Sequence, residues 1–198
     1  MAAELRRRMA QTHLTSDSAL DNLLTFSKSN SLNVLELGSG IGTTGIVFAQ
    51  LVPRSKVLLT DVADAMEILD QNIELAKPAK ESTVGRAVLD WEEELPTMIQ
   101  TTKWDIILIS DCTYNVDTIP ALANTLRKVV DKSPAALIVI ATKVRHESEA
   151  IFFDMMKDRR FTVAEQLSIV LPDKFKVKMG TDPDKVHIYI FENMDNRL

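Results

Sequence analysis

The feature that most constrains the fold is a regular alternation of short apolar runs and helical stretches from Asn33 to Ala141. The runs are rich in β-branched residues and nearly free of polar ones, which is typical of strands buried on both faces of a parallel sheet. They cover residues 34–37, 57–60, 106–109 and 136–141, with a weaker run at 84–89. Repeated strand, helix, strand units imply right-handed crossovers, so the pattern predicts a doubly wound α/β sheet.

Three stretches between these runs have helical character and recognisable ends. Residues 43–51 and 63–76 are each followed closely by a proline, which cannot continue a helix. Residues 118–130 carry Pro120 in the first turn, where proline is tolerated. The crossover helices that a parallel sheet requires are therefore present in the sequence.

The pattern changes after Thr142. A helix at about 147–159 is followed by two extended runs, 161–170 and 185–191, joined by a polar connector. Two strands that follow one another without a helix are antiparallel neighbours. Together with five parallel strands, this pair predicts a mostly parallel, seven-stranded sheet with an antiparallel last strand pair. This expected sheet resembles the Rossmann-like sheet of class I methyltransferases, whereas a plain dinucleotide-binding fold does not end in this way.

The composition sets limits on the kind of protein. The 198 residues suit one globular domain, which we expect to span 1–198 with a short helical segment at 1–32. One cysteine excludes an internal disulfide framework, and with three scattered histidines it cannot form a Cys/His zinc site. Since the N-terminus also lacks the apolar segment of a secretory signal, we expect a cytoplasmic protein that also enters the nucleus.

Charge and hydropathy indicate which kinds of partner the chain is expected to have. No run of about 18 apolar residues is present, so we expect no membrane span. A net charge of -5 disfavours nucleic acid as the main partner, because phosphate binding depends on a basic surface. The same charge suits a basic protein partner, and we expect the chain to be a monomer.

The strongest local motif runs from the strand at 34–37 through Gly38-Ser39-Gly40 into a helix. Glycine lets a ligand approach the backbone, and a helix N-terminus favours polar ligand groups. A dinucleotide fingerprint is one interpretation, but Thr43 stands where its last glycine is expected. Glu36 lies two residues before the first glycine, where a carboxylate would repel a pyrophosphate but can bind water or loop amides around an amino-acid moiety.

Two further candidates follow the next strands. Asp61 ends the second strand about 20 residues after the glycine turn, where a carboxylate can accept both ribose hydroxyls of a nucleoside. Asp90 and Trp91 follow the third strand and are candidates for the edge and face of an adenine ring. A loop or capping role for Asp61 and a packing role for Trp91 are the alternatives.

The motif that addresses the acceptor is Ser110-Asp111-Cys112-Thr113-Tyr114, directly after the run 106–109. Asp111 can hold an amine by hydrogen bonds, and Tyr114 can flank a cation with its ring. An ordinary loop before the next helix is the alternative. Cys112 is not expected to act as a nucleophile, because no Pro-Cys dipeptide is present, and His13, His146 and His187 are expected to be structural.

These residues resemble the family-16 seven-strand protein lysine methyltransferases, in the branch directed at chaperones and elongation factors. The resemblance spans roughly residues 33–192, and its most specific element is the Asp-x-x-Tyr motif at 111–114. It also rests on the following groups: Leu35-Glu36-Leu37-Gly38-Ser39-Gly40, Asp61, Asp90-Trp91, Arg145-His146-Glu147, Arg160-Phe161-Thr162-Val163 and Val186-His187-Ile188-Tyr189.

The resemblance implies S-adenosyl-L-methionine as the cofactor and a protein substrate, with a chaperone or translation factor as candidates. Asp111 and Tyr114 would be the catalytic residues at the lysine end of the site. The cofactor contacts would fall on Gly38, Ser39, Gly40, Asp61, Trp91 and Ser110, in addition to Glu36 and Asp90.

One departure from the family concerns the N-terminus. Family members usually have an N-terminal tryptophan that helps to close the pocket, but here the only tryptophans are Trp91 and Trp104. A shortened isoform, a divergent member that uses residues 14–26 as its lid, and a member without activity are the readings that remain. A small-molecule N- or O-methyltransferase and a non-catalytic binding protein therefore stay as alternatives to lysine methylation, with an NAD-linked oxidoreductase as a remote one.

Overall fold

The computed structural model describes residues 30–143, 148–170 and 185–197. Most of the expected N-terminal segment 1–32, the proposed lid 14–26, His13 and Arg145-His146-Glu147 lie outside these residues. Among the described residues, no helix is long and apolar enough to cross a membrane.

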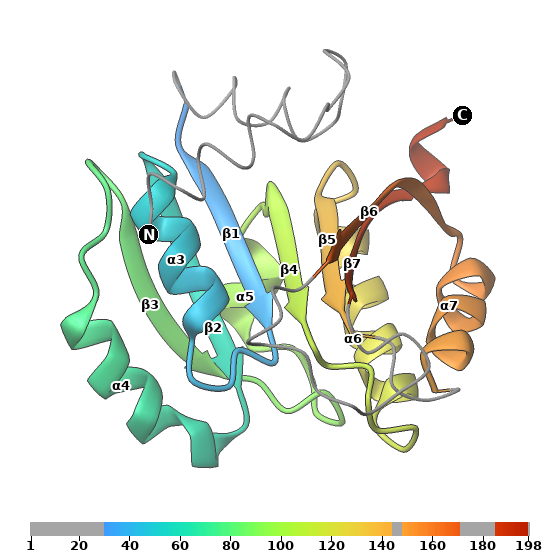
Figure 1. The fold of residues 1–198 in the computed structure, drawn as a ribbon, viewed down its shortest axis with the longest axis horizontal. Helices are drawn as coiled ribbons and strands as arrows, with labels where there is room; N and C mark the ends of the chain where they lie inside the picture. The colour runs from blue at the N-terminus through green and yellow to red at the C-terminus, as the bar shows by residue number, and fades with distance from the viewer. Residues whose placement is uncertain (1–29, 144–147, 171–184, 198) are drawn as a thin grey trace.

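The described residues form one seven-stranded sheet with helices on both faces (Figure 1). The strands are β1 (Leu32–Leu37), β2 (Ser55–Asp61), β3 (Thr83–Val88), β4 (Ile106–Ser110), β5 (Leu137–Thr142), β6 (Phe161–Val170) and β7 (Lys185–Asn193). The helices are α3 (Thr43–Leu51), α4 (Met66–Leu75), α5 (Thr97–Thr101), α6 (Ile119–Lys132) and α7 (Ser148–Asp158), with short 3-10 turns η1 (Ala63–Ala65) and η3 (Met194–Arg197).

The strand order is β3-β2-β1-β4-β5-β7-β6. Strands β1 to β5 are parallel, and β7 lies between β5 and β6, antiparallel to both. The predicted mostly parallel sheet with an antiparallel end is confirmed.

The chain leaves β1 toward β2 on one side and returns to β4 on the other, so the sheet reverses its order between β1 and β4. Ligands of open α/β sheets bind at such a point, beyond the carboxyl ends of the strands.

Two hydrophobic clusters cover the two faces of the sheet. Alternate β1 residues face opposite ways: Val34 packs with α3 and α4, whereas Leu35 and Leu37 pack with α5, α6 and α7. The apolar runs of β1 and β4 are buried almost completely because helices cover both of their faces. Glu36 is the polar residue in the buried part of β1 and points toward α3, where Gly45 leaves room for it.

Several predicted boundaries are corrected. The helix expected at 63–76 begins with η1 and becomes α-helical only at Met66, and Asp64 makes no side-chain cap for it. Helix α6 covers Ile119–Lys132 instead of the expected 118–130, with Pro120 in its first turn as predicted. Helix α5 has five residues and was not predicted, because so short a helix leaves no apolar periodicity to detect.

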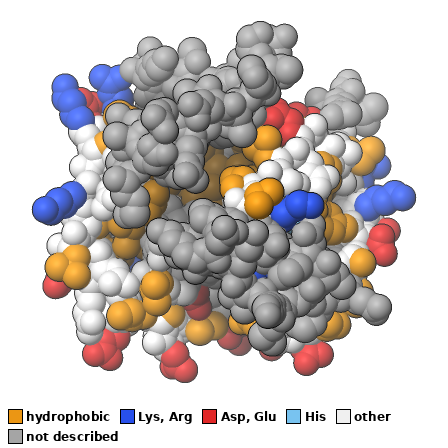
Figure 2. Space-filling model, viewed as in Figure 1, with side chains coloured by type: hydrophobic (Ala, Val, Ile, Leu, Met, Phe, Trp, Pro, Cys, Tyr) orange, Lys and Arg blue, Asp and Glu red, His pale blue; other side chains and the backbone are white. Residues whose placement is uncertain are grey.

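Charged side chains are distributed unevenly over the described residues. Figure 2 shows acidic side chains along the lower margin of the molecule, the margin toward which the parallel strands point in Figure 1. Acidic residues gather at the carboxyl ends of three parallel strands: Asp61 and Asp64 at the end of β2, Asp90, Glu92 and Glu93 after β3, and Asp111 and Asp117 after β4. The edge of the sheet that would receive a ligand is therefore acidic.

Candidate active site

A pocket of about 830 Å³ opens at the carboxyl ends of β1, β2 and β4. It lies at the point where the sheet reverses its order, which is the predicted location of a ligand. All ten predicted site residues line it: Glu36, Gly38, Ser39, Gly40, Asp61, Asp90, Trp91, Ser110, Asp111 and Tyr114. The structure thus brings together in space four segments that are separated in the sequence, one at the end of each of β1, β2, β3 and β4.

The glycine-rich loop forms one wall of the pocket. Gly38 has φ +68°, and a Cβ atom there would lie 2.6 Å from Cys112 Sγ and 3.0 Å from Trp91 Cζ2. Only glycine fits this position, because both the backbone region and the space exclude a side chain. Gly40 has φ +54° and open space around it, so its backbone is exposed toward the pocket.

Glu36 lies beneath this loop and is only 1% exposed. Its Oε2 accepts a hydrogen bond of 2.9 Å from the backbone N–H of Gly45 in the first turn of α3. Burial raises the pKa of Glu36 from 4.5 to about 7, and hydrogen bonds from Gly45 and Thr44 offset part of this effect. Glu36 therefore binds one backbone amide, which comes from α3 instead of the glycine loop, and its predicted role at an amino-acid moiety stays a prediction.

Asp61 ends β2 and connects two segments of the pocket wall. Its Oδ2 accepts the N–H of Gly40 at 2.7 Å, and its Oδ1 accepts the N–H of Val62 at 2.8 Å. Each carboxylate oxygen keeps a further acceptor site, so the side chain can still receive ribose hydroxyls. These two contacts show the loop role that was the alternative for Asp61, and the nucleoside role stays a prediction.

Asp90 and Trp91 form the wall after β3. Asp90 Oδ1 accepts the N–H of Glu92 at 3.0 Å, which makes the short turn that presents Trp91 to the pocket. Trp91 is half-buried and packs against the core, and Thr125 of α6 donates a hydrogen bond of 3.1 Å to its backbone carbonyl. Trp91 therefore packs against the core and also lines the pocket, and its contact with an adenine ring stays a prediction.

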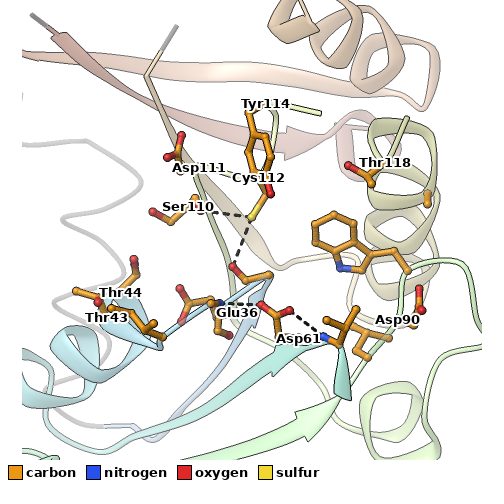
Figure 3. Close-up of a pocket in the computed structure, with 18 of the residues that line it drawn as sticks. Glu36, Thr43, Thr44, Asp61, Asp90, Ser110, Asp111, Cys112, Tyr114 and Thr118 are labelled. Carbon is orange, nitrogen blue, oxygen red and sulfur yellow. Dashed lines mark hydrogen bonds between the residues drawn. The ribbon is translucent and has the colours of Figure 1, made fainter. Parts of the chain in front are cut away.

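The segment 111–114 forms the opposite wall. Asp111 and Tyr114 lie across the pocket from Asp61 and Asp90 (Figure 3). Asp111 has φ +58°, a left-handed backbone that non-glycine residues rarely adopt, and its N–H donates to Ala141 O at 2.8 Å. Tyr114 is 62% exposed, so its ring is available to a ligand.

Cys112 points inward between these walls. Its Sγ contacts three backbone carbonyl oxygens, those of Leu37, Gly38 and Ser110, at 3.3 to 3.5 Å. Burial raises the pKa of the Cys112 thiol to about 12, so almost none of it is thiolate at neutral pH. This supports the expectation that Cys112 packs rather than attacks a substrate.

The pocket has a one-sided electrostatic character. Five carboxylates line it, from Glu36, Asp61, Asp90, Glu92 and Asp111, and none of the described lining residues is Lys, Arg or His. Such a pocket attracts cationic ligands and disfavours phosphate groups. The remote dinucleotide interpretation therefore loses support from the chemistry of the site.

Some lining residues were not predicted. Thr43 and Thr44 come from the first turn of α3, and their position after the glycine loop was a usable signal. Thr118 and Ala121 come from the start of α6, where only the packing of the helix decides which residues face the pocket.

Comparison with known proteins identifies relatives of the chain. A family model described as lysine methyltransferase matches residues 5–159. The chain is 37% identical to a UPF0665 family protein of Schizosaccharomyces pombe, over 65% of this chain and 38% of that protein. It is 31% identical to the mouse protein N-lysine methyltransferase METTL21A, over 83% of this chain and 68% of that protein. The chain thus spans 38% and 68% of these two curated relatives.

Solved structures support the fold. A SAM-dependent methyltransferase from Methanosarcina mazei superposes with a TM-score of 0.64, covering 87% of this chain and 97% of that one. The sequence identity is 9%, so the likeness concerns the fold alone. It shows that the described sheet is that of class I methyltransferases.

Proposed function

The chain belongs to the lysine methyltransferase family, and on this premise we propose that it transfers a methyl group from S-adenosylmethionine to the ε-amine of a lysine in a protein. The observation that carries the proposal is the acidic pocket at the end of a class I methyltransferase sheet, which no Lys, Arg or His of the described part of the chain lines. A sulfonium and a lysine side chain are both cations, so this lining suits both reactants.

The residues of the pocket fit such a cofactor. The missing Cβ atom at Gly38 and the open space at Gly40 allow close approach of a ligand to the loop. Asp61 would accept the ribose hydroxyls through the free acceptor sites of its carboxylate. Trp91 and Asp90 would contact the face and the edge of the adenine, and Glu36 would support the amino-acid end through the loop and the start of α3.

When bound, S-adenosylmethionine supplies an electrophilic methyl group on a positively charged sulfur. Asp111 would accept a hydrogen bond from the lysine ε-amine and orient its lone pair for in-line attack, which provides most of the rate through alignment. The exposed ring of Tyr114 would lie beside the amine as it approaches the methyl group. The lysine must be neutral to attack; a nearby cation and partial desolvation lower its pKa, and the proton can leave to water.

The partner and the location in the cell belong to the same proposal. The family resemblance of the motif at 111–114 supports a chaperone or a translation factor as substrate, and the acidic edge of the sheet suits a basic segment around the target lysine. We place the protein in the cytoplasm, with the nucleus as a second site, and expect a monomer without bound nucleic acid. Light scattering on a sizing column and imaging of a fluorescent fusion test these points.

The test has two stages. Isothermal titration of the protein with S-adenosylmethionine and S-adenosylhomocysteine, repeated on Asp61→Ala, should show micromolar binding that the variant loses. Tritiated S-adenosylmethionine is then incubated with dialysed lysate proteins and, separately, with a metabolite extract. Tritium in a protein, located on a methyl-lysine by mass spectrometry, is the expected result.

Other outcomes point to the alternatives. Label only in the metabolite extract would indicate a small-molecule methyltransferase. Absence of cofactor binding by the wild-type chain would remove the proposed activity and leave a binding protein with a methyltransferase fold.

A further inference from the structure

Two buried threonines meet where the segment 111–114 passes the end of β5. The hydroxyl oxygens of Thr113 and Thr142 lie 3.0 Å apart, and the residues are 2% and 3% exposed. Neither residue is among those that line the pocket. A buried hydroxyl that loses its partner carries a desolvation cost, so the two groups depend on each other.

The segment alternates between exposed and buried side chains. Asp111 and Tyr114 are exposed toward the pocket, whereas Cys112 and Thr113 between them are buried. The two side chains that would face the acceptor are therefore held in place by the two that point inward. The left-handed backbone of Asp111 makes this support necessary, because a strained conformation persists only where its surroundings hold it.

The two inward residues attach the segment to different parts of the molecule. Cys112 contacts the carbonyls of Leu37 and Gly38, at the glycine loop on the cofactor side. Thr113 contacts Thr142 at the end of β5, beside the bond from Asp111 N–H to Ala141 O. Strand β5 lies within the sheet between β4 and β7, which makes it a rigid support.

We propose that Thr113 and Thr142 are positioning residues for methyl transfer: their hydrogen bond holds the segment 111–114 so that Asp111 and Tyr114 face the acceptor amine. The inference rests on the proposed function, because it assumes that the amine binds at this wall. Neither threonine touches the reacting atoms. Since the cofactor wall is held by other contacts, loss of the bond disturbs the acceptor side and leaves cofactor affinity unchanged.

The variants separate the hydroxyl group from its volume. Thr142→Val removes the hydroxyl at nearly constant shape, and Thr142→Ser keeps the hydroxyl. Thr142→Val is expected to lower the rate of tritium transfer into dialysed lysate proteins by about tenfold or more at saturating cofactor, because small misplacements are costly in an aligned reaction. Titration with S-adenosylhomocysteine should give the wild-type affinity, and Thr142→Ser should recover the rate.

The double variant Thr113→Val, Thr142→Val separates positioning from stability. Removing both hydroxyls leaves no orphaned buried group, so stability should recover relative to the single variants. The methyl-transfer rate should stay low, because the bond that holds the segment is still missing. A double variant with the wild-type rate overturns the proposal.

Amide hydrogen exchange gives a readout that needs no activity. In Thr142→Val the amides of residues 111–114 should exchange faster than in the wild type, while those of the glycine loop stay protected. Ser133→Ala is the matched control. It removes a buried hydroxyl that accepts the backbone N–H of Trp104 at 2.9 Å, near the amino ends of β4 and β5 and away from the pocket. It should lower stability without changing exchange at 111–114.

The outcomes distinguish this inference from the proposed function. Unchanged exchange at 111–114 in Thr142→Val overturns the positioning role, whatever the activity. A wild-type chain that labels no protein refutes the proposed function, and exchange still decides the positioning role. Parallel losses of cofactor affinity and rate, or a slow Thr142→Ser, would mean a general structural role and would also overturn the inference.

Discussion

Asp111 combines a carboxylate that faces the pocket with a left-handed backbone at φ +58°, and substitution can separate the two properties. Asparagine tolerates this backbone region and lacks the charge, whereas alanine lacks the charge and is strained by about 1 kcal/mol. Asp111→Asn should therefore keep stability and cofactor binding and lose methyl transfer by roughly tenfold to a hundredfold. Asp111→Ala should also lower the free energy of unfolding.

Rates of tritium transfer, titration calorimetry and urea unfolding of both variants check this prediction. Asp111→Gly serves as the control for the backbone, because glycine relieves the strain without restoring the carboxylate. An Asp111→Asn protein that methylates at the wild-type rate would show that the carboxylate does not orient the amine.

Glu36 provides a prediction on pH. Burial raises its pKa from 4.5 to about 7, so the folded state holds a proton that the unfolded state has released between these values. The contribution of Glu36 to the free energy of unfolding is therefore greatest below pH 4.5. This contribution is lost as the pH rises through about 7. A shift of this size corresponds to about 3 kcal/mol as an order of magnitude.

Glu36→Gln keeps an oxygen that can accept the Gly45 N–H and removes the titration. Urea unfolding between pH 4.5 and 8 should show a steeper loss of stability in the wild type than in Glu36→Gln. Equal slopes for the two proteins would mean that Glu36 does not titrate in this range.

At the scale of the elements, α6 connects the two walls of the pocket. Its N-terminus follows the segment 111–114, and Thr125, 1% exposed in its middle, donates to the Trp91 carbonyl. Thr125→Val should lower stability by about 1 kcal/mol and release the loop that presents Trp91. Weaker binding of S-adenosylhomocysteine is expected, with recovery in Thr125→Ser. A Thr125→Val protein that loses stability but binds the ligand normally would restrict this bond to a structural role.

The elements also show what sequence reasoning can reach. The apolar runs of β1 and β4 were predictable because burial on both faces leaves no place for polar residues. Their converging carboxyl ends made the main site residues predictable as well, since residues after parallel strands meet at one edge. Strand β7 lies between β5 and β6, and this order depends on long-range pairing that no local pattern records.

Contacts between distant residues were equally hidden. The bond between Thr113 and Thr142 joins residues 29 positions apart, and that between Thr125 and Trp91 spans 34 positions. A threonine in an apolar strand or helix has no local sign of its partner. Such contacts support the site without lining it, and only the structure reveals them.

At the scale of the whole molecule, the sheet has edges of unlike charge. Arg54, Lys56 and Lys103 lie near the amino ends of the parallel strands, opposite the pocket. The acidic residues gather at the carboxyl ends of β2, β3 and β4. The described lysines at this edge, Lys143 and Lys185, lie beside β5 and β7. Among the described residues, acidic side chains thus outnumber basic ones at the edge that holds the pocket.

This distribution should steer a basic segment of a protein substrate toward the pocket. Charges on exposed side chains are screened as ionic strength rises, with a Debye length of about 10 Å at 0.1 M salt. The apparent KM for the protein substrate should therefore increase with sodium chloride, whereas kcat should change little because the aligned complex forms the same local contacts. S-adenosylhomocysteine carries no net charge, so its affinity should stay nearly constant and controls for damage to the pocket.

Charge reversal by Glu92→Lys and Glu93→Lys should reduce the salt dependence of KM. A KM that does not respond to salt would show that substrate recognition depends on apolar contacts instead of the acidic edge.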